Sequence, residues 1–187
     1  MKIERERVRE TFREYTDAYD ATDEKIKLKI DHTYRVAELC ERIAKAERME
    51  KTEVDLAWLL GMLHDVGRFE QLRRYGTFSD ADSIDHAALG TDILFGGPLS
   101  AGKGLIRTYV DDAAEDEVIE TAIRVHSAYR IPEGLVPRME KLCHILRDAD
   151  KIDILRVNVD VPLEEIYNTT TEELRNAAVT QAVVESF

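Results

Sequence analysis

Helical periodicity dominates the pattern of apolar and polar positions along the chain. Apolar residues recur every three or four positions, and no segment has the strict alternation that is typical of a half-buried β-strand. Four prolines and nine glycines leave long uninterrupted stretches. The pattern predicts an all-α fold, a single-domain helical bundle. Its expected helices cover residues 3–19, 25–47, 52–66, 83–95, 98–109, 112–129, 137–157 and 171–186.

The expected helices are separated by recognisable start and stop signals. Thr22 and Thr52 precede acidic residues and are candidate N-caps. The runs at 96–98 and 131–134 contain glycine and proline and predict breaks. Residues 67–86 are polar and mixed in charge, which favours a loop that shapes access to a site. Nothing resembles a linker or a repeat, so we expect one domain over residues 1–187.

Composition limits the classes of protein to which the chain can belong. A hydrophobic fraction of 44% and a charged fraction of 34% are typical of a soluble globular domain. The N-terminus has no apolar signal-peptide core, which favours a cytoplasmic location. The net charge of −12 argues against nucleic acid and anionic membranes as partners, although not against a nucleotide substrate. Cys40 and Cys143 fall on apolar stripes and are expected to be buried thiols. The sequence predicts no oligomeric state.

Four of the five histidines occupy helix faces that would be buried. A single inward histidine is usually an ordinary core residue, but four in one small domain suggest a shared purpose. Asp65 follows one of them inside an apolar stretch, and a buried carboxylate needs a cation or several donors. Imidazoles and carboxylates together are what a divalent metal ion requires. The inward histidines are His32, His64, His86 and His126.

The helix expected over 137–157 adds two inward aspartates. At 100° per residue, Asp150 and Asp153 lie within its apolar arc, whereas Asp148 shares the polar side with His144 and Lys151. Either the two inward aspartates face a metal ion, or they pair with arginines. Helix geometry alone leaves both interpretations open.

These residues resemble the H…HD…D signature of the HD superfamily. LLGMLHDVGRF is similar to the family's apolar helix that ends in an HD pair, and RDADKIDIL to its late helix with the last aspartate. The resemblance covers about residues 28–155 and implies an HD-type domain core flanked by N- and C-terminal helices. It also implies that His32, His64, Asp65 and Asp150 hold a divalent metal ion.

Two further segments resemble members of the superfamily with two metal ions. DHAALGTDIL is similar to a stretch in which those members have a proline where this chain has Ala87, and IRVHSAYRIP to one that carries a further histidine. This resemblance implies that His86 and His126 complete a second site and that Asp65 bridges both ions. The alternative is that these two histidines bind substrate phosphate beside a single ion. The HHE and GYP signatures are absent, so no cyclic-di-GMP phosphodiesterase activity is expected.

The resemblance implies a metal-dependent hydrolase of a phosphate monoester, diester or anhydride, on a small nucleotide-like phosphorylated substrate. One or two ions of Mn, Fe, Co, Ni, Zn or Mg would supply a hydroxide that attacks phosphorus. With Asp65, Arg68 is a candidate catalytic residue because it could bind phosphate, unless it forms a surface ion pair. Lys151 is a second substrate-binding candidate. Asp153 either accepts a ring N–H from a ligand histidine or pairs with an arginine. The alternatives in function are a di-iron oxygenase and a non-catalytic, metal-stabilised nucleotide-binding module.

Overall fold

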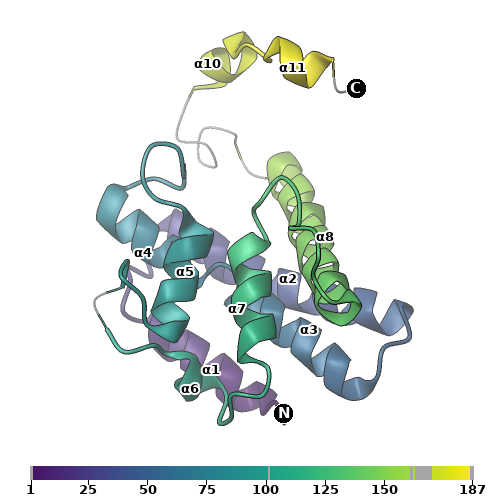
Figure 1. Cartoon of the computed structure of the whole chain (residues 1–187). Coiled ribbons are helices and arrows are strands. Elements are labelled where there is room, and N and C mark those ends of the chain that lie inside the picture. Colours follow the sequence, from purple (N-terminus) through teal and green to yellow (C-terminus); the bar gives the residue numbers. More distant parts are fainter. Residues whose placement is uncertain (1, 101, 161, 163–169, 186–187) are drawn as a thin grey trace.

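The computed structural model describes residues 2–100, 102–160, 162 and 170–185 (Figure 1). The all-α prediction is confirmed, since the described residues contain helices and no strand. The helices are α1 (Arg5–Thr16), α2 (Glu24–Ala46), α3 (Lys51–Leu63), α4 (Val66–Tyr75), α5 (His86–Phe95), α6 (Ile106–Tyr109), α7 (Asp116–Val125), α8 (Pro137–Asp160), α10 (Thr171–Asn176) and α11 (Gln181–Val184). None of them is both long enough and apolar enough to pass through a lipid bilayer.

Three of the expected segments differ in the structure. The loop expected over 67–86 begins as helix α4, whose apolar side chains Val66, Phe69 and Leu72 share one buried face. Of the helix expected over 98–109, only Ile106–Tyr109 is an α-helix among the described residues, and it forms α6. Before it the chain forms a turn, because the Asp92 carboxylate accepts a hydrogen bond from the Leu99 N–H at 2.8 Å. The helix expected over 171–186 is divided into α10 and α11, and its last residue lies outside the described residues.

Both predicted N-caps are wrong by one or two positions. The N-cap of α2 is Asp23, whose carboxylate accepts a hydrogen bond from the Lys25 N–H at 2.8 Å. The Thr22 hydroxyl instead donates to Asp20. Helix α3 starts after Glu50, so Thr52 lies in its first turn. In each case an acidic residue stands at the helix start, where it suits the positive end of the helix dipole.

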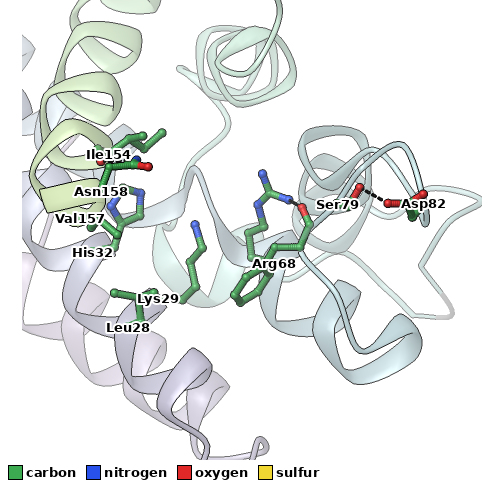
Figure 2. Close-up of a pocket in the computed structure, with 10 residues that line it drawn as sticks. Leu28, Lys29, His32, Arg68, Ser79, Asp82, Ile154, Val157 and Asn158 are labelled. Atoms are coloured by element: carbon green, nitrogen blue, oxygen red, sulfur yellow. Dashed lines mark hydrogen bonds between the residues drawn. The ribbon is translucent and has the colours of Figure 1, made fainter. Parts of the chain in front are cut away.

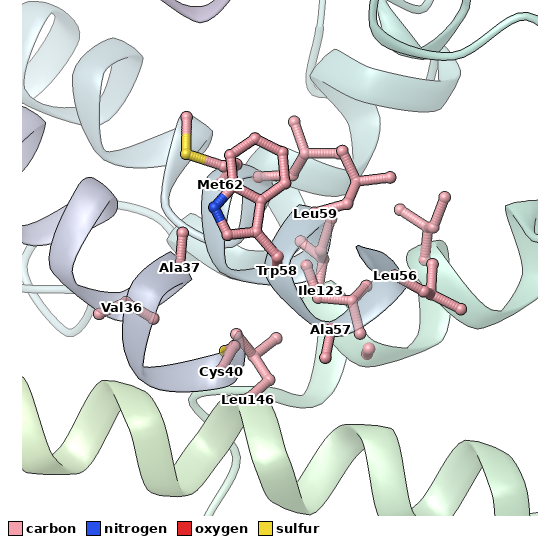
Figure 3. Close-up of a cluster of buried hydrophobic side chains, with 14 of the residues drawn as sticks. Val36, Ala37, Cys40, Leu56, Ala57, Trp58, Leu59, Met62, Ile123 and Leu146 are labelled. Atoms are coloured by element: carbon pink, nitrogen blue, oxygen red, sulfur yellow. The ribbon is translucent and has the colours of Figure 1, made fainter. Parts of the chain in front are cut away.

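Helix α3 forms the centre of the bundle. Every residue from Leu56 to Leu63 is buried, and Figure 3 shows its side chains among those of α2, α7 and α8. Gly61 allows α2 to approach closely, because a Cβ at this position would lie 2.5 Å from the Ala37 Cα. The largest core side chain, Trp58, is 2% exposed, and Cys40 and Cys143 are buried free thiols as predicted. A helix buried on all sides can carry polar groups inward only if other groups satisfy them.

Candidate metal centre

Five helices or helix ends direct the histidines and aspartates of the sequence pattern toward one point. His32 lies in α2, His86 is the first residue of α5, and His126 follows the last residue of α7. The His64–Asp65 pair occupies the break between α3 and α4, where Asp65 has the non-helical angles φ −106° and ψ 15°. Helix α8 supplies Asp150. All six side chains are buried, with at most 5% of each residue exposed.

One half of the cluster contains His32, His64, Asp65 and Asp150. The Nε2 atoms of His32 and His64 lie 3.3 Å apart. Asp150 Oδ1 is 3.2 Å from the His32 Nε2 and 3.7 Å from the His64 Nε2. Asp65 Oδ2 is 3.6 Å from each of the same two nitrogens. The four side chains therefore surround a common point with two nitrogen and two oxygen atoms.

The other half contains His86, His126 and the second oxygen of Asp65. The Nε2 atoms of the two histidines lie 3.1 Å apart. Asp65 Oδ1 is 3.5 Å from the His86 Nε2 and 3.8 Å from the His126 Nε2. Each oxygen of the Asp65 carboxylate thus faces a different pair of histidines, so this one side chain lies between the two halves.

Hydrogen bonds on the outer side of each ring fix which nitrogen faces the centre. The Nδ1 of His64 donates to the Gly61 carbonyl at 2.8 Å, and the Nδ1 of His126 donates to the Ile123 carbonyl at 2.7 Å. A carbonyl can only accept, so in the neutral ring Nδ1 carries the proton and Nε2 keeps its lone pair. His32 and His86 direct Nδ1 to carboxylates, each at 2.6 Å. All four Nε2 atoms are therefore oriented as metal ligands.

The electrostatics of the cluster agree with this orientation. Burial lowers the pKa of His64 to about 3 and that of His86 to about 4, so both imidazoles are neutral at pH 7. Burial alone would raise the pKa of Asp65, but the nearby Lys29 ammonium and the imidazoles hold it well below its usual range. For His32, the hydrogen bonds to Asp150 and Asp153 outweigh burial and raise the pKa. The Lys29 ammonium thus offsets part of the negative charge of the buried carboxylates.

The donor atoms fit one or two divalent metal ions. Ligand atoms at about 2.0–2.2 Å from a shared ion lie roughly 3–3.5 Å from one another. Most of the distances within each half are close to this range, as given above. Two lone pairs that face each other, as between His86 and His126, need a positive charge between them. A further grouping of Asp80, Asp85 and His86 has another explanation. Asp80 accepts from the His86 Nδ1, and Asp85 is the N-cap of α5.

Comparison with protein families gives a match that spans the six converging side chains. The family model described as HD domain matches residues 30–155, which include all six converging side chains. The chain belongs to the HD domain family. The match nearly coincides with the core of 28–155 expected from the sequence, while a single domain over all 187 residues stays a prediction. Comparisons with curated proteins and with solved structures gave no match. HD domains bind divalent metal ions and are typically metal-dependent hydrolases, which agrees with the His and Asp groups of this chain.

Arg68 lies beside the metal centre of this HD domain, although the helix does not continue from His64 as the sequence suggested. Its guanidinium bonds Gln71 and Asp80 through Nη1, and its Nε is 3.7 Å from Asp65 Oδ1. This Nε is buried without a hydrogen-bond partner among the residues that the structure describes. The expected alternative, an ion pair with Glu70 or another acid, forms with Asp80 at 2.7 Å, whereas Glu70 pairs with Arg73 and Arg74.

The structure places the other two candidates differently. Lys151 is largely exposed, and its ammonium contacts Asp150 Oδ2 at 3.1 Å. Asp153 is buried and makes both of the contacts that the sequence left as alternatives. It accepts from the His32 Nδ1 at 2.6 Å and from the Arg35 Nε at 2.9 Å. Arginine pairing and orientation of a histidine are therefore compatible. The roles of both residues in binding or catalysis remain predictions.

Sequence reasoning missed two residues of the site. The Lys29 ammonium lies 2.8 Å from Asp65 Oδ2, and it was detectable because Lys29 is three residues before His32 on the same helix face. Asp80 orients His86 and also bonds Arg68 at 2.7 Å. It lies in the loop of residues 76–85, where no periodic pattern assigns directions to side chains.

We expect Asp80→Asn to weaken metal binding at the His86–His126 half by about 10–100-fold, the usual effect of losing a partner that orients a ligand. Metal titration followed by elemental analysis measures the affinity, and thermal unfolding checks that the variant folds. Asp82→Asn is the matched control, since the Asp82 carboxylate is exposed and bonds Ser79 in the same loop. Equal affinities in wild type and Asp80→Asn would contradict this role.

Proposed function

We propose that this protein is a metal-dependent phosphohydrolase that cleaves the phosphate ester or anhydride bond of a small phosphorylated molecule. The observation that carries the proposal is a pair of cationic groups beside the metal centre. The Lys29 ammonium and the Arg68 Nε face opposite oxygens of Asp65, at 2.8 and 3.7 Å. Both side chains line a cavity of about 320 Å³ that also reaches the His32 ring (Figure 2). Cationic donors next to a metal site suit a phosphoryl group.

When bound, a divalent ion would lower the pKa of a water molecule and neutralise negative charge on phosphoryl oxygens. The residues of the chain position the substrate. The Arg68 Nε has a proton without an acceptor, so a phosphoryl oxygen would satisfy it. The Lys29 ammonium would move from Asp65 to a second phosphoryl oxygen once other cations compensate the carboxylate. Asp80 holds the Arg68 guanidinium in place through Nη1.

The substrate would be small and phosphorylated. Lys29 and Arg68 in the cavity lining favour a phosphorylated substrate over an uncharged organic one. We therefore favour hydrolysis over oxygen activation by a di-iron centre, which the same His and Asp ligands could also hold. The metal expected for the His-rich set is Mn, Fe, Co, Ni or Zn, with Mg less suited. The proposal includes two ions, because each oxygen of Asp65 faces its own pair of histidines.

Phosphate release from a panel of phosphate esters and anhydrides, under anaerobic conditions with Mn²⁺, tests the proposal. We expect turnover without oxygen, and we expect Lys29→Met to lower kcat/KM by about 10–100-fold through loss of a charged hydrogen bond. Lys27→Met is the control, since Lys27 is an exposed residue of the same helix that pairs with Glu24. Turnover that requires both iron and oxygen would favour the oxygenase. A nucleotide that stabilises the protein and is recovered intact would favour the binding module.

A further inference from the structure

The cavity beside the metal centre has two chemically different sides (Figure 2). Lys29 and Arg68 lie at the side that meets Asp65, together with the His32 ring. The rest of the lining comes from α2, α8 and the loop of residues 76–85, and it combines four apolar residues with the polar Ser79, Asp82 and Asn158. Its apolar members are Leu28, Phe78, Ile154 and Val157. Such a division suits a ligand with one charged end and one apolar end.

Three of the four apolar side chains are not fully covered by other parts of the described chain, whereas Val157 is buried. Leu28, Phe78 and Ile154 are each only partly buried, although they stand next to a fully buried metal centre. Ile154 and Val157 are one helical turn apart on α8 and face the cavity together. Apolar surface that stays open inside a cavity is a favourable contact for an apolar ligand.

Phe78 connects the two sides. Its ring lies 5.3 Å from the Lys29 ammonium and 6.0 Å from the Arg68 guanidinium carbon. The ring therefore contacts the groups proposed to bind phosphate while it forms part of the apolar wall. A flat group attached directly to the phosphate would lie against this ring, as aromatic pairs prefer offset or edge contacts at about 4.5–7 Å.

The charges of the lining favour a single phosphate. Lys29 and Arg68 are the cationic groups among the described residues that line the cavity, and both are next to Asp65. Farther along, the lining contains the exposed Asp82 carboxylate, bonded to the Ser79 hydroxyl at 2.6 Å. A second or third phosphate would meet this carboxylate instead of another cation. The volume of about 320 Å³ is also at the low end for ligand sites.

We infer that the substrate is a phosphate monoester of a compact, flat and largely apolar alcohol, and that Leu28, Phe78, Ile154 and Val157 select it. The inference rests on the proposed phosphohydrolase function. A polyol phosphate would place hydroxyl groups against Leu28, Phe78, Ile154 and Val157, whose side chains offer no hydrogen-bond partner, and this contact costs free energy. A polyphosphate would leave negative charge without cations.

Steady-state hydrolysis of benzyl phosphate and of glycerol 3-phosphate by the metal-loaded protein tests the inference. Both are esters of primary alcohols, so their leaving groups are similar and the comparison isolates the organic part. We expect kcat/KM to be at least about tenfold higher for benzyl phosphate, as is usual for an apolar group in a fitting pocket. Pyrophosphate, which has two phosphates and no organic part, should be a poorer substrate than benzyl phosphate.

Two variants test whether the apolar lining residues cause the preference for benzyl phosphate. Leu28→Gln and Ile154→Gln are each expected to reduce the benzyl-to-glycerol ratio of kcat/KM by about tenfold. Leu155→Gln is the control, because Leu155 is 69% exposed on α8 and does not line the cavity. Equal kcat/KM values for the two esters in the wild type, or a ratio that the wall variants leave unchanged, would overturn the inference.

Binding separates this inference from the proposed function. Calorimetry with benzylphosphonate and methylphosphonate, which resist hydrolysis, reports on the cavity even if no ester is turned over. Tighter binding of benzylphosphonate than of methylphosphonate, lost in Leu28→Gln but kept in Leu155→Gln, would support the apolar selection. If no ester is hydrolysed, this result would show that only the proposed hydrolytic function is wrong. Equal binding of the two phosphonates would contradict the selection whether or not esters are hydrolysed.

Discussion

The Asp65→Ala variant is expected to lose both bound metal and all hydrolytic activity. Asp65 contributes one carboxylate oxygen to each half of the centre, at 3.5–3.8 Å from the histidine nitrogens. No other aspartate or glutamate among the described residues takes this shared position, so its removal leaves both histidine pairs without their common anionic ligand. The loss should exceed the roughly 10–100-fold effect of removing a partner that only orients a ligand.

Elemental analysis of protein purified without chelator, together with phosphate release, measures both effects. Asp148→Ala is a matched control, because Asp148 is exposed on the outer side of α8, two residues before the inward Asp150. Thermal unfolding in the presence of chelator shows whether the variant keeps its fold. A folded Asp65→Ala protein that retains metal and activity would refute the assignment of the centre.

Gly67→Ala is expected to produce the largest loss of stability among single methyl additions near the site. Gly67 lies in the first turn of α4, and a Cβ there would be 2.1 Å from the His86 carbonyl oxygen and 2.7 Å from the Gly90 nitrogen. Both are backbone atoms, so the helices α4 and α5 must separate. Overpacking of this kind typically costs about 1–3 kcal/mol, and the backbone contacts place this site at the upper end or beyond.

The separation would also move His86 away from Asp65, so metal affinity should fall together with stability. Denaturant unfolding of the metal-free protein measures the first effect, and metal titration the second. Gly102→Ala is the control, since a Cβ at Gly102 would meet no atom within 4 Å. A Gly67→Ala protein as stable as the wild type would show that α4 and α5 do not depend on this close approach.

The fold class and the inward direction of the site residues were predictable because both follow from helical periodicity, and the resemblance to the HD superfamily implied that these residues meet. The inward faces that hold His32 and His126, and the separation of inward Asp150 from outward Asp148, were read from 100° per residue. The periodicity failed where local polar contacts compete with it. The segment before α6 was expected to be helical, but it contains Gly102 and Gly104, and the Asp92 carboxylate binds its backbone in a turn.

Other features depended on tertiary contacts that no pattern in one sequence records. The break at His64–Asp65 lies inside an otherwise apolar stretch, with no glycine or proline at the break itself, so the expected helix continued to residue 66. The contact between Asp80 and His86 joins a loop to a helix start, and its direction is set by the packing of α4 against α5. The cavity beside the metal centre likewise combines three elements, which could be related to one another only once the bundle was assembled.

The loop of residues 76–85 contributes to two tasks at once. It begins at Gly76, whose φ of 69° ends α4 in a left-handed conformation, and it supplies both Phe78 to the cavity and Asp80 to His86. Only Ser79 lies between the ring proposed to select substrates and the carboxylate that accepts the His86 hydrogen bond. Mutations that reshape this loop and so broaden the range of accepted substrates should therefore also weaken metal binding. A variant evolved to accept many substrates would need further substitutions elsewhere in the bundle to restore metal binding.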